Sequence, residues 1–170
     1  MSPAATKFRI RPLLPADQAF LWDALHVALW DPPPAPLRPR EILDRPDVRK
    51  YAANWGGPGD VGVLGELAED QTPVGAAWMR LLPGGDTFGY VDELTPQFGI
   101  AVLPPFHRLG LGRRMLLAAL AAAREHGYPR VALTVHRENP AVSLYESCGF
   151  RKVEVRTGYH LMIAPLGAQG

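Results

Sequence analysis

Two glycines and three arginines gather between His107 and Arg114. An alanine- and leucine-rich run follows them, which predicts that the glycines lie at the start of a helix. Because glycine has no Cβ, the backbone there can approach a ligand closely, and the first amides of a helix have no acceptor within it. The helix dipole and the guanidinium groups of Arg108, Arg113 and Arg114 would both attract an anion. We therefore predict a pyrophosphate-binding turn.

Two other glycine motifs fit this segment poorly. A Walker loop ends in Gly-Lys followed by Ser or Thr, and neither the lysine nor the hydroxyl is present. A dinucleotide-binding fingerprint needs a third glycine where Met115 stands, and its strand enters the turn more directly than residues 103–108 allow. The alternative to phosphate binding is a glycine-rich helix entry whose arginines are only solvated.

The elements around the turn are predicted to form a βαβ unit. Residues 98–102 and 130–135 have the pattern of strands, and residues 112–126 have that of a helix that ends before Gly127. A strand, helix and strand in this order favour a parallel pair with a right-handed connection.

A pair of prolines, Pro104 and Pro105, follows the first of these strands. Proline has no N–H to give to a sheet, so strand pairing should stop just past Val102. Backbone groups at the end of this strand are then free for a ligand.

The rest of the chain supplies further strands and helices around this unit. Alternating patterns indicate strands at 8–11, 61–68, 73–82, 151–157 and 159–163. Helical spacing and capping residues indicate helices at about 15–28, at about 40–53 and after Asn139 and Pro140. The proline-rich residues 31–39 predict an extended loop.

Length and composition describe one globular domain. The chain has 170 residues, of which 47% are hydrophobic and 21% charged, so we expect a single domain over residues 1–170. Its formal net charge of +1 gives no general attraction to nucleic acid or to anionic lipid. Any anion site must therefore be local, and no nucleic-acid partner is expected.

Cysteine and histidine usage argues against a disulfide or a metal. Cys148 is the single cysteine, and the five histidines show no paired spacing typical of a metal site. The start of the chain has no apolar signal core, and the longest apolar run falls far short of the roughly 20 residues that a membrane span needs. We expect a soluble, cytoplasmic protein with no metal and no membrane association.

Two segments carry a resemblance to a known family. The stretches FGIAVLPPFHRLGLGRRMLLAAL and ALTVHRENPAVSLYESCGF resemble the acyl-coenzyme A binding half of the GNAT superfamily of N-acetyltransferases. The first matches that family's Gln/Arg-x-x-Gly-x-Gly/Ala motif, with His107 in the first position, and the second matches its Asn-Pro-Ala-x-x-Leu-Tyr-x-x-x-Gly-Phe segment. The resemblance is specific over residues 98–150 and looser over residues 8–163.

The resemblance implies a single-domain α/β fold. Its sheet is mixed and mostly antiparallel, with a central parallel βαβ unit and with helices on both faces. The acceptor-side half would cover about residues 8–93, and the acyl-coenzyme A binding half about residues 94–164. Pantetheine would lie in a V-shaped split between two diverging strands, pairing with the backbone of Ile100 and Val102 as an extra strand would. The amide of Val102 could also stabilise charge on the thioester oxygen.

The resemblance also implies which residues bind the cosubstrate, acetyl-coenzyme A. Arg108 and Arg114 would assist a pyrophosphate held by the residues of the turn, namely Leu109, Gly110, Leu111, Gly112 and Arg113. Asn139 is a helix cap, and in the family this position also contacts the cofactor. His107 at the first motif position should be tolerated, because the turn binds mainly through backbone amides.

Tyr145 is the predicted general acid. A thiolate leaving group needs a proton, and a phenol with a reference pKa of about 10 can supply it at neutral pH. The alternative is a tyrosine packed on the buried face of the last helix. Glu93 is the predicted base, because Gln97 stands where the family often has a glutamate and an amide can only orient a water. Cys148 is expected to belong to the core.

The sequence therefore predicts an acyltransferase. It would move an acetyl group from acetyl-coenzyme A to a primary amine by direct attack in a ternary complex. The amine could belong to a small molecule or to a protein, and the enzyme is expected to be a monomer or a homodimer. One alternative is a non-catalytic acyl-coenzyme A binding regulatory module, and another is an interaction domain that has lost the cofactor. Part of the acceptor wall is expected from aromatic residues, namely Trp22, Trp30, Tyr51, Trp55, Trp78, Phe88 and Tyr90.

Overall fold

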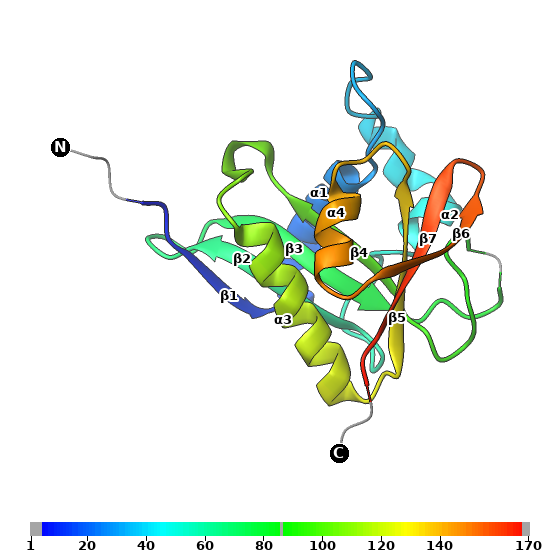
Figure 1. Cartoon of the computed structure of the whole chain (residues 1–170). Helices are drawn as coiled ribbons and strands as arrows, with labels where there is room; N and C mark the ends of the chain where they lie inside the picture. Colours follow the sequence, from blue (N-terminus) through cyan, green and yellow to red (C-terminus); the bar gives the residue numbers. More distant parts are fainter. Residues whose placement is uncertain (1–4, 86, 168–170) are drawn as a thin grey trace.

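The described part of the chain, residues 5–85 and 87–167 of a computed structural model, contains a seven-stranded sheet (Figure 1). The strands are β1 (Phe8–Pro12), β2 (Val61–Leu67), β3 (Pro73–Arg80), β4 (Gln97–Val102), β5 (Arg130–His136), β6 (Arg151–Arg156) and β7 (Tyr159–Pro165). Their order across the sheet is β1-β2-β3-β4-β5-β7-β6. The central pair, β4 and β5, is parallel and the other neighbouring pairs are antiparallel. The predicted mixed sheet is confirmed.

Helices cover both faces of the sheet (Figure 1). The long helix α3 (Leu111–His126) buries Met115, Leu116 and Ala119 in the core on one face. Helix α1 (Gln18–Ala28) buries Leu21, Ala24 and Leu25 in a second core on the opposite face. The third main helix, α4 (Ala141–Ser147), follows β5. This arrangement agrees with the predicted layers.

The two ends of α3 show why its sequence forms a helix there. Gly110 caps the start at φ 83° and Gly127 caps the end at φ 100°. Both angles lie in the left-handed region, which glycine adopts without the steric cost of a Cβ. The helix predicted for residues 112–126 is thus confirmed, with one more residue at its start.

The helix predicted over residues 40–53 is wrong in its extent. The structure has a 3-10 turn at Arg40–Asp44 and then a single turn of helix, α2 (Pro46–Arg49). Arg45 between them is extended, at φ −70° and ψ 131°. The residue before a proline is driven out of helical backbone, so Pro46 divides the segment in two.

The parallel pair β4 and β5 is joined at one point. β4 pairs with β3 along its whole length, whereas its register with β5 contains the single pair Gln97 and Ala132. The amide of Ala132 also donates to the carbonyl of Pro96 at 3.0 Å. Beyond this point the two strands are not paired, and we call the gap between them the split.

Candidate active site

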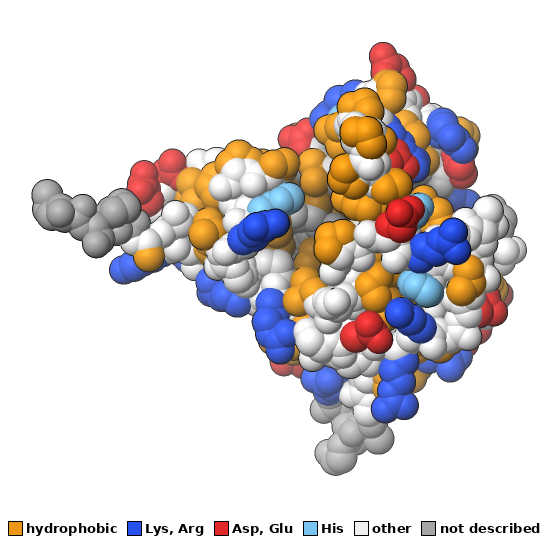
Figure 2. All heavy atoms as spheres, turned by 45° about the horizontal axis from the view of Figure 1, so that its top comes forward, with side chains coloured by type: hydrophobic (Ala, Val, Ile, Leu, Met, Phe, Trp, Pro, Cys, Tyr) orange, Lys and Arg blue, Asp and Glu red, His pale blue; other side chains and the backbone are white. Residues whose placement is uncertain are grey.

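A cleft of about 700 Å³ lies between the split and segments from the N-terminal half of the chain. One side is formed by β4 from Gln97 to Ile100, by β5 from Leu133 to His136, and by Tyr145 of α4. The other side comes from the end of α1, from α2 and the residues after it, and from the segment before β4. Seen from the end shown in Figure 2, this region is hollowed and mostly bordered by hydrophobic side chains.

The β4 backbone presents free amides to the split. The amide of Leu103 donates to Val74 of β3 at 2.8 Å, so the amides that alternate with it along β4 also face β3. The amides of Ile100 and Val102 therefore face the opposite edge, where β4 and β5 are not paired. These are the two backbone positions predicted to pair with pantetheine.

The side chain of His107 forms a hydrogen bond with the carbonyl of Val102, at the end of this edge. Its Nε2 lies 2.6 Å from the carbonyl oxygen of Val102, and only the ring nitrogen can donate in that pair. The imidazole thus ties the turn before α3 back to β4. The departure from Gln or Arg at this motif position has a structural role that the sequence did not show.

In the predicted pyrophosphate turn, which we call the phosphate cradle (residues 108–114), two residues have left-handed backbone. Arg108 has φ 62° and Gly110 has φ 83°. The first helical hydrogen bond runs from the amide of Arg114 to the carbonyl of Gly110 at 3.2 Å. The amides of residues 111–113 therefore have no acceptor within the helix. Such a turn is suited to an anion.

The three arginines of the cradle differ in their partners. Arg113 donates through Nη1 to the Oγ of Ser147 at 2.7 Å, which links α3 to α4. Arg108 and Arg114 are exposed, and the guanidinium group of neither makes a hydrogen bond or ion pair with any residue that the structure describes. Two guanidinium groups are thus available to a ligand of the cradle. Leu109 is exposed on the turn, and the side chain of Leu111 is buried, so Leu111 can contribute through its amide.

Tyr145 lines the cleft and is 8% exposed. Its ring packs against Phe150, with centroids 5.8 Å apart. Its hydroxyl makes no hydrogen bond within the described chain, where no fully buried side-chain oxygen lacks a partner, so it must reach the cleft. Burial raises the pKa of Tyr145 to about 12, which keeps the phenol protonated at neutral pH.

Asn139 has the capping contact that its position predicts. Its Oδ1 accepts a hydrogen bond from the amide of Ala141 at 2.9 Å, and α4 begins at Ala141. The residue also lines the cleft. Capping is therefore observed, while a contact with the cofactor stays a prediction.

Glu93 is not among the residues that line the cleft. It is exposed, in a turn before β4. Its neighbour Asp92 accepts hydrogen bonds from the Thr95 hydroxyl at 2.8 Å and the Leu94 amide at 2.9 Å, and it pairs with Arg130. The Thr95 hydroxyl, the Leu94 amide and Arg130 together hold the pKa of Asp92 below its usual value. Asp92 therefore has a structural role in this turn.

Gln97 lies at the closed end of the split and lines the cleft. Its side chain is buried, and its Oε1 accepts a hydrogen bond from the Tyr51 hydroxyl at 3.3 Å. Its Nε2 donates to the Oγ1 of Thr87 at 2.5 Å. The carboxamide is thus fixed in place and carries no ionisable group.

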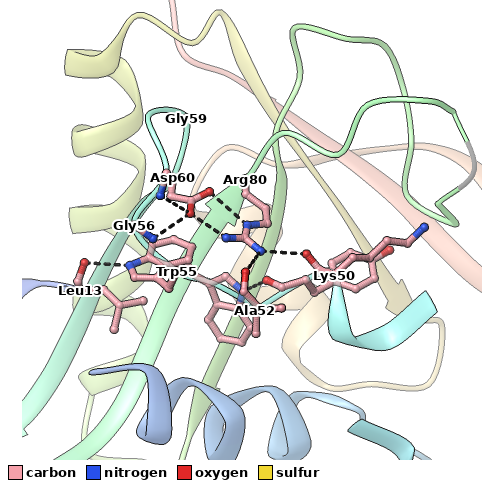
Figure 3. Close-up of polar contacts among 12 residues, drawn as sticks. Leu13, Lys50, Ala52, Trp55, Gly56, Gly59, Asp60 and Arg80 are labelled. Carbon is pink, nitrogen blue, oxygen red and sulfur yellow. Dashed lines mark hydrogen bonds and ion pairs between the residues drawn. The ribbon is translucent and has the colours of Figure 1, made fainter. Parts of the chain in front are cut away.

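A buried ion pair supports the wall of the cleft that lies opposite the split (Figure 3). Arg80 of β3 pairs with Asp60 at 2.7 Å, and through Nη1 it donates to the carbonyls of Lys50 at 3.0 Å and Ala53 at 2.8 Å. The indole of Trp78 donates to the carbonyl of Tyr51 at 2.9 Å. These bonds fix the segment that brings Lys50 and Tyr51 to the cleft.

The Asp60 carboxylate is itself well satisfied. The amides of Gly56 and Gly57 each donate to its Oδ2 at 3.0 Å. Burial alone would raise the pKa of Asp60, but Arg80 and these two amides outweigh it, and the pKa lies below its usual value. The carboxylate is therefore charged at neutral pH.

Four of the seven aromatic residues predicted on the acceptor side line the cleft: Trp30, Tyr51, Trp78 and Phe88. Trp55 is a core residue, and Trp22 lies beneath the guanidinium of Arg49 outside the cleft. Sequence reasoning missed His136 and Tyr159, which also line it. They are opposite each other in the register of β5 and β7, and pairing across strands is not visible in a sequence alone.

Among residues 5–85 and 87–167, no three His, Cys, Asp or Glu side chains are grouped so that they could hold a metal ion. In the same residues, no helix combines the length and the apolar character needed to cross a bilayer.

Solved structures share this fold. The chain superposes on the ribosomal-protein-S18-alanine N-acetyltransferase of Escherichia coli with a TM-score of 0.66 at 18% identity, covering 96% of this chain and 97% of that one. It also superposes on an N-acetyltransferase of Thermoplasma acidophilum in complex with coenzyme A, with a TM-score of 0.63 at 15% identity, covering 94% and 99%. The fold is therefore that of the N-acetyltransferases.

Residues 22–150 match the model of the acetyltransferase (GNAT) family, and the chain belongs to this family. A ribosomal protein bS18-alanine N-acetyltransferase of Haemophilus influenzae is 36% identical over 88 residues, which are 48% of this chain and 60% of that protein. A mycothiol acetyltransferase of Thermomonospora curvata is 38% identical over 95 residues, 55% of this chain and 29% of that protein. The match thus spans less than two thirds of each of these relatives.

Proposed function

We propose that this protein transfers an acetyl group from acetyl-coenzyme A to a primary amine by direct attack within a ternary complex. The observation that carries the proposal is the split, which lies between the end of β4 and β5 and borders a cleft lined by Tyr145. Membership of the acetyltransferase family supports the same activity.

The residues of the cradle and the split fit acetyl-coenzyme A. The amides of residues 109–113, with Arg108 and Arg114, would hold the pyrophosphate, and the free amides of Ile100 and Val102 would pair with the pantetheine arm. When bound, acetyl-coenzyme A supplies an acetyl group activated as a thioester. There is open space for a ligand beside Gly110, where a Cβ would meet nothing within 4 Å.

Tyr145 is the proposed proton donor to the leaving thiolate. Its pKa of about 12 means that the phenol stays protonated across the neutral range. Tyr145→Phe should lower kcat by about 10²–10⁴-fold, the usual contribution of a positioned acid, and leave the Kd of coenzyme A unchanged. Thiol release and calorimetry measure the two quantities.

Tyr90→Phe is the matched control, because Tyr90 does not line the cleft. A kcat for Tyr145→Phe equal to that of the control would remove the acid role. If no amine supported release of the thiol from acetyl-coenzyme A, although the protein still bound coenzyme A, the result would favour the second candidate function. That function is a non-catalytic acyl-coenzyme A binding module. The specific observation in favour of that module is the neutral Gln97 in the cleft.

The cleft offers no evident base for an ammonium group. Among the described lining residues Asp47 is the one carboxylate, and a hydrogen bond from Arg45 holds the pKa of Asp47 below its usual value. The Nδ1 of His136 already accepts a hydrogen bond from the amide of Glu138 at 3.1 Å. The other charged groups of the lining, Arg38 and Lys50, are cations. We propose that the amine enters neutral, with Gln97 orienting a water.

This proposal predicts that kcat/KM follows the neutral fraction of the acceptor. At pH 7.5 an α-amine with a pKa near 7.9 is about 30% neutral, and an ε-amine with a pKa of 10.4 is about 0.1% neutral. Acceptors of the first kind should therefore react on the order of 100-fold better. For each amine, kcat/KM should rise about tenfold per pH unit until the amine's own pKa is reached.

Two variants separate this proposal from the predicted base Glu93. Gln97→Glu should increase the rate with high-pKa amines and flatten their pH profile. Glu93→Gln should leave the wild-type profile unchanged, whereas a base at Glu93 requires that the variant lose activity. The pH dependence of thiol release, measured over a series of amines, distinguishes the two.

The names of the relatives give the range of acceptors to begin with. The protein of Haemophilus influenzae is named for an alanine of a ribosomal protein, and that of Sulfurisphaera tokodaii is an N-alpha-acetyltransferase, 40% identical over 76 residues, which are 39% of this chain and 46% of that protein. We propose that amines of the α-amino type, on peptides or on small molecules, are the first acceptors to test.

A further inference from the structure

Four aromatic rings form a continuous series along the cleft. Trp30 lies 5.7 Å from His136, His136 lies 5.2 Å from Tyr159, and Tyr159 lies 5.3 Å from Phe88, measured between ring centroids. All four residues line the cleft, and we call them the aromatic row. They come from the loop after α1, from β5, from β7 and from the segment before β4.

The aromatic row does not belong to either hydrophobic core. None of its four members is part of the two core clusters of the described residues, whereas Trp55 and Trp78 are buried in one of them. Phe88 is 42% exposed. Ring surface left on the wall of a cleft contributes little to folding, and it is the kind of surface that binds apolar ligands.

The charges beside the aromatic row favour a neutral ligand over a cation. Arg38 forms two hydrogen bonds with Asp31, at 2.7 and 2.8 Å. At the other end Arg156 donates to the carbonyl of Phe88 at 2.9 Å and pairs with Glu154. Each of these carboxylates is therefore already neutralised by an arginine.

Neighbouring rings of the aromatic row are steeply inclined to each other. The planes of Tyr159 and Phe88 meet at 85°, and those of His136 and Tyr159 at 75°, so that neighbouring rings present faces and edges in alternation. Aromatic ligands bind such surfaces by offset stacking and edge-to-face contact. The hydrogen bond from the Glu138 amide to Nδ1 holds the His136 ring in this orientation.

We propose that the aromatic row is an acceptor subsite that binds the ring of a primary arylalkylamine. The inference rests on the proposed acetyltransferase function, because the row occupies the same cleft as Tyr145 and Gln97. It assigns the substrate class: a primary amine joined by a short chain to an aromatic ring.

The first test measures binding and needs no turnover. Phenethylamine, 2-cyclohexylethylamine and spermidine are titrated into the protein by calorimetry, with and without saturating coenzyme A. The two ring compounds have similar size, so the difference between their affinities, each corrected for the neutral fraction of the amine, reports the aromatic contact. We expect phenethylamine to bind about 2- to 12-fold more tightly than its cyclohexyl analogue on this basis. Spermidine should bind more weakly than either. Equal affinities for the two ring compounds would overturn the proposal.

Variants connect this preference to the aromatic row. Phe88→Leu and Trp30→Leu each keep an apolar side chain and remove one terminal ring, so they should abolish the preference for phenethylamine. Trp22→Leu is the matched control, since this tryptophan lies outside the cleft, and it should keep the preference. Loss of the preference in the control as well, or its retention in both row variants, contradicts the assignment.

A turnover assay separates the inference from the function on which it rests. Thiol release with phenethylamine should show a lower KM than with 2-cyclohexylethylamine, and Phe88→Leu should raise only the first KM. Turnover with other amines but no preference for the aromatic ring overturns the subsite alone. Selective binding of phenethylamine without acetyl transfer to any amine overturns the proposed function and keeps the subsite.

Discussion

Replacing Gly112 with glutamate is expected to abolish coenzyme A binding and to leave the fold intact. Gly112 lies in the first turn of α3, and a Cβ there would be 3.8 Å from Val102 and 4.0 Å from Leu144, which is ordinary contact. A carboxylate at the start of a helix interacts favourably with its dipole, so the variant should be no less stable than the wild type. The same carboxylate would occupy the cradle and repel a pyrophosphate.

The thermal shift caused by coenzyme A measures this effect. At a ligand concentration 100 times its Kd, binding stabilises the folded state by about 2.7 kcal/mol, which corresponds to roughly 5–11 °C for a chain of this size. Gly112→Glu should show no shift, and Gly112→Ala should keep most of it because a methyl group fits. A full shift in the glutamate variant would show that the cofactor binds elsewhere.

Replacing Arg80 with methionine is expected to have the largest effect on stability. The side chains of Arg80 and Asp60 are 11% and 9% exposed, so removing the guanidinium leaves a buried carboxylate without its ionic partner. Breaking a buried pair in this way costs about 3–5 kcal/mol of the free energy of unfolding. The carbonyls of Lys50 and Ala53 would lose a donor at the same time.

Urea denaturation at pH 7 compares this variant with a control on the surface. The pair of Arg45 with Asp47 is 61% and 59% exposed, and Arg45→Met should change the free energy of unfolding by less than about 1 kcal/mol. Equal effects of the two substitutions would mean that the buried pair contributes nothing special. If Arg80→Met folds, its KM for the amine should rise as well, because the segment that carries Lys50 and Tyr51 loses the hydrogen bonds from Arg80.

The effect of Arg80→Met should depend on pH. The pKa of Asp60 is lowered in the folded protein, so its contribution to stability is present above the ordinary carboxyl pKa and is lost as the pH falls through the lowered value. The difference between wild type and variant should therefore shrink in acid. A difference that stays constant down to the acid transition would argue against the ion pair as its cause.

The segments around α3 and the end of β4 are predictable from local sequence. Gly110, Gly127 and the prolines that follow Val102 act through their own backbone, so they determine the start and end of α3 and the end of β4 wherever they occur. Asn139 likewise caps α4 through a contact two residues away. Features of this kind need no knowledge of the rest of the fold.

The wall of the cleft opposite the split depends on contacts between distant residues and is less predictable. Tyr51 meets Gln97 across 46 positions of the sequence, and Arg156 meets Phe88 across 68. No pattern within a short window reports such pairs. The aromatic row is not predictable from the sequence for the same reason, because no local pattern shows that Tyr159 of β7 lies beside His136 of β5.

Gln97 and Ala132 form the single register pair between two parts of the sheet, β1–β4 and β5–β7. Segments with few hydrogen bonds between them tend to open as separate units, so we expect these two parts of the sheet to separate most easily between β4 and β5. A ligand with an amide-bearing chain, bound between β4 and β5, would supply backbone hydrogen bonds that the two strands do not make with each other. The ligand would then act as a temporary strand that makes two half-sheets behave as one.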